Sequence, residues 1–120
     1  MTTDDVEFTA VVPVVPVTNA GEAIAFYRDK LGFELSFEAG PDYAGVSRLG
    51  TELHLDGVVN GAAGEVSVRI TTHGIDALYA ELEPQGVIHP EEPLETKPWG
   101  LRQFSVVDLD GNRITFAQPA

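Results

Sequence analysis

Two ionisable side chains, Glu52 and His54, stand two positions apart in a segment where polar and apolar residues alternate. On a β-strand this spacing puts both side chains, together with Asp56, on one face. A carboxylate beside an imidazole suits general acid–base catalysis, and the same two groups can also bind a divalent metal ion. Polar neighbours on a strand are commonly only solvated, so the cluster alone leaves catalysis, binding and solvation open.

A second candidate feature is the segment Lys97–Asn112, which contains the only tryptophan, Trp99, in a Pro-Trp-Gly loop. A large aromatic residue on a proline-stiffened loop before a hairpin is typical of the edge of a ligand site. The alternative is that the ring only packs on the core. Arg102 has two similar interpretations, as a donor to a ligand or as an internal salt-bridge partner.

Composition narrows the classes of function. The chain has 120 residues, no cysteine, and 19 acidic against 7 basic residues, for a formal net charge of −12. This charge repels nucleic acid and anionic lipids, attracts a cationic ligand, and also serves solubility. No apolar run approaches the roughly 20 residues of a membrane span. The acidic, polar start lacks the features of a secretory signal, so we predict a cytoplasmic protein.

Hydrophobic periodicity predicts an α+β protein with a repeated order of elements. The first strand should lie at a sheet edge or cross between sheets, because it contains two prolines. Asn19, with Glu22 three residues later, is typical of a helix N-cap. The predicted strands are 8–17, 33–38, 43–49, 52–56, 65–71, 87–88, 101–107 and 113–117, and the predicted helices are 19–30 and 75–82.

Sequence matches between the halves indicate a duplication. Ala25-Phe26-Tyr27 corresponds to Ala77-Leu78-Tyr79 in the two helices, and the hairpin 43–56 corresponds to 103–117. Each half reads βαβββ, and one such unit leaves a sheet face uncovered. We therefore predict two tandem βαβββ modules in a single domain, residues 1–60, which begin with an acidic tail, and residues 61–120.

Several motifs resemble the glyoxalase/bleomycin-resistance (vicinal oxygen chelate) superfamily, and most of all its bleomycin-resistance proteins. The resemblance covers residues 10–118 and rests on Pro13, Ala25-Phe26-Tyr27, Leu31-Gly32-Phe33, Asp42-Tyr43-Ala44-Gly45-Val46, Lys97-Pro98-Trp99-Gly100 and Asp110-Gly111-Asn112. It implies a curved, half-open mixed sheet and a homodimer that exchanges its first strand at Pro13. It also implies grooves at the dimer interface that sequester a small-molecule antibiotic without a cofactor, a metal or a reaction.

Metal-dependent members of this superfamily bind their ion through His, Gln and Glu side chains. The matching positions here are Val12, Glu52, Val66 and Thr115, of which only Glu52 suits a divalent ion. We therefore predict a protein that is not an enzyme. The alternative is a metal-dependent glyoxalase- or dioxygenase-type enzyme that uses Glu52 and His54.

The resemblance also implies the ligand-binding residues. Aromatic side chains would stack on flat rings, and carboxylates would hold protonated amines. His54 and Arg69 replace aromatic residues of a known member; Arg69 could stack on a ring or hold a carboxylate, which leaves a related amphipathic natural product as an alternative to bleomycin. Phe37 could instead belong to the core. The predicted ligand-binding residues are Phe37, Tyr43, Glu52, His54, Asp56, Arg69, Trp99 and Arg102.

Overall fold

Two βαβββ modules follow one another along the chain. The computed structural model describes residues 5–57 and 63–120. The first module contains β1 (Val14–Pro16), α1 (Ala20–Asp29), β2 (Glu34–Glu38), β3 (Tyr43–Arg48) and β4 (Thr51–Asp56). The second contains β5 (Ser67–Thr71), α2 (Ile75–Leu82), the 3₁₀ turn Glu83–Gln85, β6 (Glu95–Thr96), β7 (Leu101–Val107) and β8 (Arg113–Pro119).

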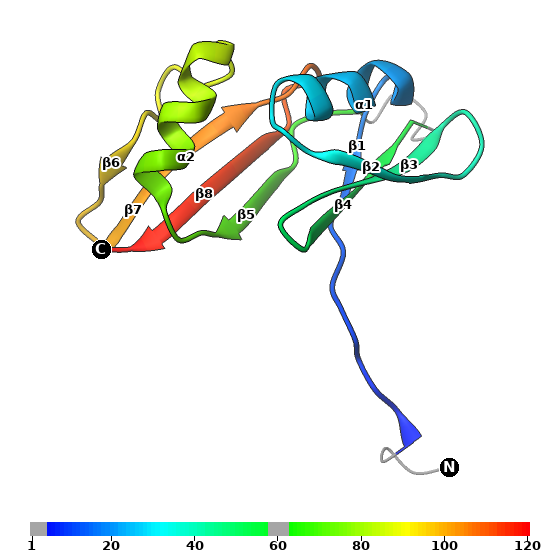
Figure 1. Ribbon diagram of the computed structural model, residues 1–120, viewed down its shortest axis with the longest axis horizontal. Helices are drawn as coiled ribbons and strands as arrows, with labels where there is room; N and C mark the ends of the chain where they lie inside the picture. The colour runs from blue at the N-terminus through cyan, green and yellow to red at the C-terminus, as the bar shows by residue number, and fades with distance from the viewer. Residues whose placement is uncertain (1–4, 58–62) are drawn as a thin grey trace.

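The strand orders confirm the predicted duplication. The sheets run β1-β4-β3-β2 and β5-β8-β7-β6, so each module places its last strand beside its first. Those two strands are parallel, and the other neighbours are antiparallel, which makes both sheets mixed as predicted. Within one chain these are two separate four-stranded sheets, side by side in Figure 1. The predicted boundary between residues 60 and 61 lies outside the described residues.

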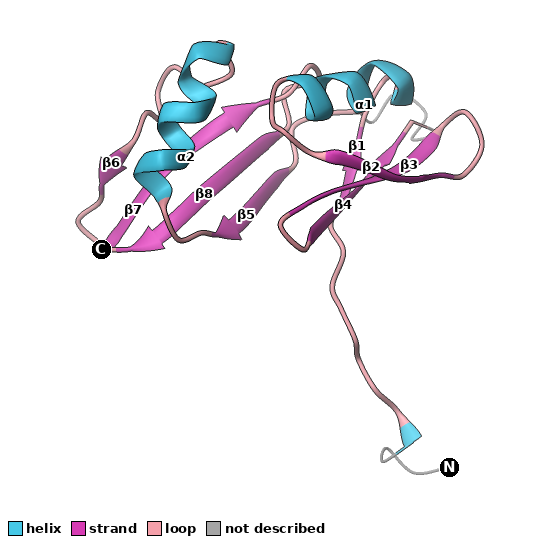
Figure 2. Ribbon diagram, in the orientation of Figure 1, coloured by secondary structure: helices cyan, strands magenta, loops and turns pink. Residues whose placement is uncertain are grey.

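Both helices lie on the same side of the two sheets (Figure 2). The apolar side chains beneath them form one cluster that joins the modules, including Tyr27 and Leu31 from the first and Leu82 and Phe104 from the second. The opposite side of each sheet, which we call its inner face, is therefore not needed for this core. In the part of the chain that the structure describes, no helix is both long enough and apolar enough to span a membrane.

Helix boundaries follow local signals in the sequence. The Asn19 side chain accepts a hydrogen bond from the Glu22 amide at 2.9 Å, which confirms the predicted N-cap of α1. The second helix begins at Ile75 and ends at Leu82, as predicted. Gly86 follows the 3₁₀ turn with a φ of 71°, a left-handed conformation that glycine adopts without steric cost.

The first strand is much shorter than the predicted segment 8–17. Only Val14–Pro16 pairs with β4, while residues 5–13 leave the body of the molecule as an extended segment (Figure 1). We call residues 5–13 the N-terminal arm. Most of its apolar side chains are exposed, Phe8 by 98% and Val11 by 94%, whereas Val12 and Pro13 are partly buried.

The sixth strand also differs from the prediction. Ile88 makes only an isolated bridge to Val106, and the strand β6 forms at Glu95–Thr96, inside the segment predicted to be a proline-rich loop. Two residues suffice there because β6 is an edge strand that pairs only with β7. Edge strands tolerate nearby prolines, which a hydrophobicity pattern alone does not reveal.

The Asp-Gly-Asn turn after β7 joins the two modules. Asp108, which is buried, accepts hydrogen bonds from the Tyr27 hydroxyl and from the Asn112 side chain, both at 2.9 Å. Asn112 in turn donates to the carbonyl of Pro16 at 2.9 Å. Burial, and then the neighbouring Asp108 carboxylate, raise the pKa of Tyr27 far above its usual value. This turn therefore has a structural role.

Candidate functional site: the inner faces of the two sheets

The inner face of the first sheet gathers five of the eight predicted ligand-binding residues. Strand pairing aligns Tyr43 with Asp56 and Gly45 with His54, and alternation places Glu52 on the same side as His54. The residues between them, Leu53 and Leu55, point into the core. The fifth member of the group is Phe37, on the neighbouring strand β2.

A chain of hydrogen bonds fixes the imidazole on this face. His54 Nε2 lies 2.9 Å from a carboxylate oxygen of Glu52, and His54 Nδ1 lies 2.8 Å from the Tyr43 hydroxyl. An ionised carboxylate only accepts hydrogen bonds, so Nε2 must carry a proton. In the neutral imidazole Nδ1 then accepts from Tyr43, and in the imidazolium it donates to Tyr43. Either form holds the ring in one orientation.

A β-bulge turns Phe37 onto the inner face. The pairing of β2 with β3 shifts between Leu35 and Phe37, so these two side chains do not share a face as strict alternation predicts. The Phe37 ring lies over Gly45, and its centroid is 5.1 Å from that of His54 in an edge-to-face arrangement. A Cβ atom at Gly45 would overlap the ring. Phe37, 37% exposed, is therefore part of the inner face and not of the core.

Arg69 lies on the inner face of the second sheet. It is aligned with Thr115 across the β5–β8 pair and donates a hydrogen bond to the side-chain oxygen of Gln103 at 3.3 Å. The hydroxyls of Thr115 and Ser105 are 2.8 Å apart, and both side chains are buried. The immediate surroundings of the Arg69 guanidinium on the second inner face are thus neutral and polar.

Trp99 and Arg102 lie apart from these residues within a single chain. Trp99 is 64% exposed in the turn between β6 and β7, with the Lys97 ammonium 5.9 Å from its ring centroid. That turn is at the outer end of the second module (Figure 1). Arg102 faces the helix side and forms an ion pair with Asp76 of α2 at 2.7 Å. The structure thus favours the salt-bridge interpretation of Arg102, and we leave this residue out of the proposed groove.

The donor set does not fit the metal centre of the superfamily's enzymes. Thr115 is bonded to Ser105, and Val66 packs against the core, so the inward positions of the fifth strand are Ser67 and Arg69. Strand pairing also makes His54, and not Glu52, the counterpart of Thr115. Among residues 5–57 and 63–120, no three His, Asp or Glu side chains come close enough to hold an ion.

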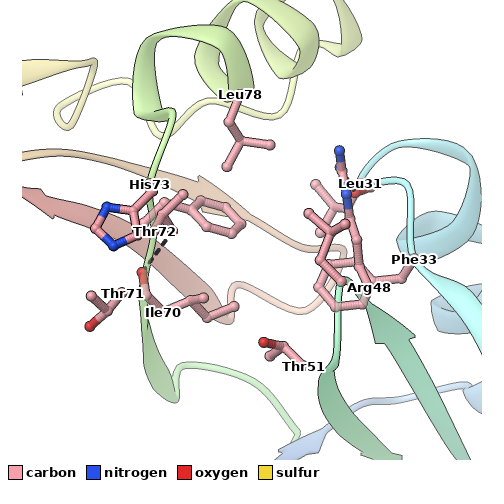
Figure 3. Close-up of a pocket in the computed structure, with 11 residues that line it drawn as sticks. Leu31, Phe33, Arg48, Thr51, Ile70, Thr71, Thr72, His73 and Leu78 are labelled. Carbon is pink, nitrogen blue, oxygen red and sulfur yellow. Dashed lines mark hydrogen bonds between the residues drawn. The ribbon is translucent and has the colours of Figure 1, made fainter.

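In the described part of the chain, two cavities are lined by residues from both modules. The β4–β5 cavity, of about 450 Å³, opens at the base of the N-terminal arm, and both Glu52 and Arg69 line it. The helix-side cavity, of about 210 Å³, is lined by Leu31, Phe33 and Leu78 with His73 at its rim (Figure 3). None of the eight predicted ligand-binding residues lines the helix-side cavity.

Sequence reasoning missed three residues that shape the inner faces. Gly45 makes room for the Phe37 ring, and a glycine inside a strand pattern is a signal of such close approach. Gln103 and Ser105 alternate with the buried Phe104 on β7, so the period of two could have placed them on the inner face. Nothing in the sequence shows which of their neighbours they contact.

The two βαβββ modules and their strand orders are those expected for the glyoxalase/bleomycin-resistance fold. A comparison with protein-family models gives the same class. The model described as "Glyoxalase superfamily protein" matches residues 1–120, and the chain belongs to that superfamily.

Within the superfamily, the similarity is to proteins that bind antibiotics. Curated bleomycin resistance proteins of Geobacillus stearothermophilus and Staphylococcus aureus are 34% identical over 125 residues, which covers 89% of this chain and 94% of theirs. The bleomycin-binding protein of bleomycin-producing Streptomyces verticillus, solved with copper(II)-bleomycin, is 29% identical with a TM-score of 0.76, covering 96% of this chain and 99% of that one. TnmS3, an antibiotic binding protein from Streptomyces sp. CB03234, is 30% identical with a TM-score of 0.78 and the same coverage.

Proposed function

We propose that this protein is a homodimer that sequesters an antibiotic of the bleomycin kind by non-covalent binding and so confers resistance. The observation that carries the proposal is the aromatic and acidic inner face of the first sheet. There Phe37, Tyr43 and His54 offer rings at fixed angles, with the Glu52 carboxylate bonded to the same imidazole. Such a surface suits a flat heteroaromatic ligand that carries an amine. The similarity to bleomycin resistance proteins supports the same conclusion.

We propose further that binding occurs without a chemical step. The side chains of His54 and Glu52 are hydrogen-bonded to each other. At the equivalent position of the second module, where a metal site would need a further ligand, the residue is Thr115. Elemental analysis of the purified protein separates this proposal from a glyoxalase- or dioxygenase-type activity. Stoichiometric, tightly held Fe, Mn, Ni or Zn would favour the enzyme.

The dimer in this proposal depends on the N-terminal arm. Phe8 and Val11 are exposed on a segment that leaves the body at Pro13, and a second copy would cover them. In the proposed dimer, Trp99 of one chain would line the groove that the first module of its partner forms. We place the protein in the cytoplasm, which its cysteine-free composition supports.

Calorimetric titration with metal-free bleomycin at low salt tests the proposed function. We expect two sites per dimer and weaker binding as salt increases, because a chain of net charge −12 attracts the cationic drug. Quenching of the single tryptophan should accompany binding if Trp99 lines the groove. An absence of heat at tens of micromolar bleomycin would refute binding of this drug.

Deletion of residues 1–12 tests the role of the arm. The deletion spares β1, whose Val15 is fully buried, so the core remains intact. We expect a folded monomer in analytical ultracentrifugation that no longer binds bleomycin. Deletion of residues 1–17 should instead give unfolded or aggregated protein, because it also removes Val15 and Val17. A shortened protein that still dimerises and binds would show that arm exchange is wrong.

A further inference from the structure

Among the residues that the structure describes, Arg69 is the arginine without a carboxylate within 4.0 Å. The other four arginines each have a carboxylate oxygen within 4.0 Å, in the pairs Arg28–Asp29, Arg48–Glu81, Arg102–Asp76 and Arg113–Glu92. In the described ranges 5–57 and 63–120, Arg69 has no such pair, and the contact of its guanidinium is the neutral side chain of Gln103. A guanidinium has five N–H donors, so most of those of Arg69 remain available to a ligand.

The acidic groups near Arg69 are bonded to other residues. Glu52 lines the same β4–β5 cavity, but its carboxylate is bonded to His54. Glu95 is aligned with Gln103 across the sheet, but it pairs with Lys97 at 3.0 Å. Acidic residues outnumber basic ones by 19 to 7, so a carboxylate partner for Arg69 was readily available in composition. The two nearby carboxylates nevertheless pair with His54 and Lys97 instead of Arg69.

The surface around the guanidinium is polar and held in place. Thr115, aligned with Arg69, is hydrogen-bonded to Ser105, and both are buried on the sheet. Gln103, which is 8% exposed, fixes one side of the guanidinium. Neutral donors and acceptors around one unpaired cation are the surroundings in which a carboxylate forms charge-assisted hydrogen bonds.

We propose that Arg69 binds a carboxylate of the ligand and thereby selects the class of molecule that the groove prefers. The ligand class is a flat aromatic compound that carries an amine toward Glu52 and a carboxylate toward Arg69. This inference rests on the proposed function, because it assigns a specificity-determining residue to the same groove. The net charge of −12 attracts the amine, whereas Arg69 disfavours a ligand that is cationic at both ends.

The test compares two probes that differ in one charged group. Bleomycin A2 ends in a cationic tail, and bleomycinic acid has a carboxylate in place of that tail. Their affinities for wild-type protein, Arg69→Gln and Arg113→Gln are measured by calorimetry at one salt concentration. Arg113→Gln is the matched control, because Arg113 shares the inner face of the sheet but is paired with Glu92.

We expect wild-type protein and Arg113→Gln to bind the acid more tightly than bleomycin A2. Arg69→Gln should lose about tenfold in affinity for the acid and nothing for bleomycin A2, which removes the preference. If both probes bind and their affinity ratio is the same in Arg69→Gln, the inference about Arg69 is wrong while the proposed function stands. If neither probe binds the wild-type protein, both the proposed function and this inference fail.

Discussion

The hairpins β3–β4 and β7–β8 hold equivalent places in the two modules but carry different inner faces. In the first, His54 lies between Val14 and Gly45 on the neighbouring strands. In the second, Thr115 lies between Arg69 and Ser105. One inner face thus presents rings and carboxylates, and the other presents hydroxyls, an amide and the guanidinium groups of Arg69 and Arg113.

The helix-facing sides of the same hairpins are alike. Their side chains are apolar and buried under α1 and α2, and they belong to one cluster: Val46, Leu53 and Leu55 in the first, and Phe104, Val106, Ile114 and Phe116 in the second. Burial of these residues supplies the stability of both modules. The duplication therefore preserves the face that the fold needs, and the inner face can differ because folding depends on it less.

The largest loss of stability is expected from a substitution at the buried junction that connects the two modules. Asp108→Ala removes the acceptor for Tyr27 and Asn112 in the buried junction between the modules. Because these buried donors would then lack an acceptor, the free energy of unfolding should fall by about 3 kcal/mol. Urea denaturation measures this loss. Leu109→Ala in the same turn, where the side chain is 61% exposed, should change stability little.

The sequence predicts the strands, the helices and their apolar, helix-facing sides better than it predicts the inner faces. Periodicity located α2 and both long hairpins, because burial imposes a regular pattern on Leu53, Leu55 and their counterparts. The capping residue Asn19 located the start of α1. The arm was predicted to be a strand because Phe8–Val17 is apolar. Whether such a segment pairs depends on a neighbouring edge, which no local pattern encodes.

The inner faces depend on contacts that the sequence alone does not specify. The bulge at Phe37 reverses the face expected from alternation with Leu35, and a one-residue irregularity leaves no compositional mark. The cluster of Glu52 and His54 was visible from spacing, but the third member, Tyr43, comes from the adjacent strand. Arg102 was ambiguous because its partner, Asp76, is 26 residues away in a helix.

Gly45→Ala tests one difference between the hairpins. The first hairpin has Gly45 where the second has a residue with a side chain, Ser105. A methyl group at Gly45 would overlap the Phe37 ring, so we expect a loss of about 2 kcal/mol in unfolding free energy. In a Phe37→Ala background the same change should cost almost nothing, since glycine is itself unfavourable in a strand. Thermal denaturation of the four proteins of this cycle measures the coupling. An equal cost in both backgrounds would mean that the ring does not depend on Gly45.

His54→Ala tests whether the difference between the inner faces is functional. It removes the ring that joins Tyr43 to Glu52, and we expect bleomycin to bind about tenfold more weakly, with little change in stability. Thr115→Ala is the matched variant at the equivalent position of the other hairpin, and it should reduce affinity less. Calorimetric titration compares the two. A larger loss of affinity in Thr115→Ala would reverse the assignment of the main ligand contacts to the first module.

The smallest effect concerns the hydroxyl of Tyr27 under α1. Tyr27→Phe should lower stability at pH 7 by about 1 kcal/mol, because Asp108 keeps its other donors.

Burial and Asp108 raise the pKa of Tyr27 above its unfolded value of about 10, so the folded protein keeps a proton that the unfolded chain loses above that pH. The contribution of this group is complete below about pH 10 and declines as the pH rises further, by up to about 1.4 kcal/mol per unit. Urea denaturation of both proteins between pH 7 and 11.5 should therefore show a shallower alkaline decline for Tyr27→Phe, and the two curves should cross above about pH 10.5. Parallel curves would mean that the Tyr27 hydroxyl ionises equally readily in the folded and unfolded states.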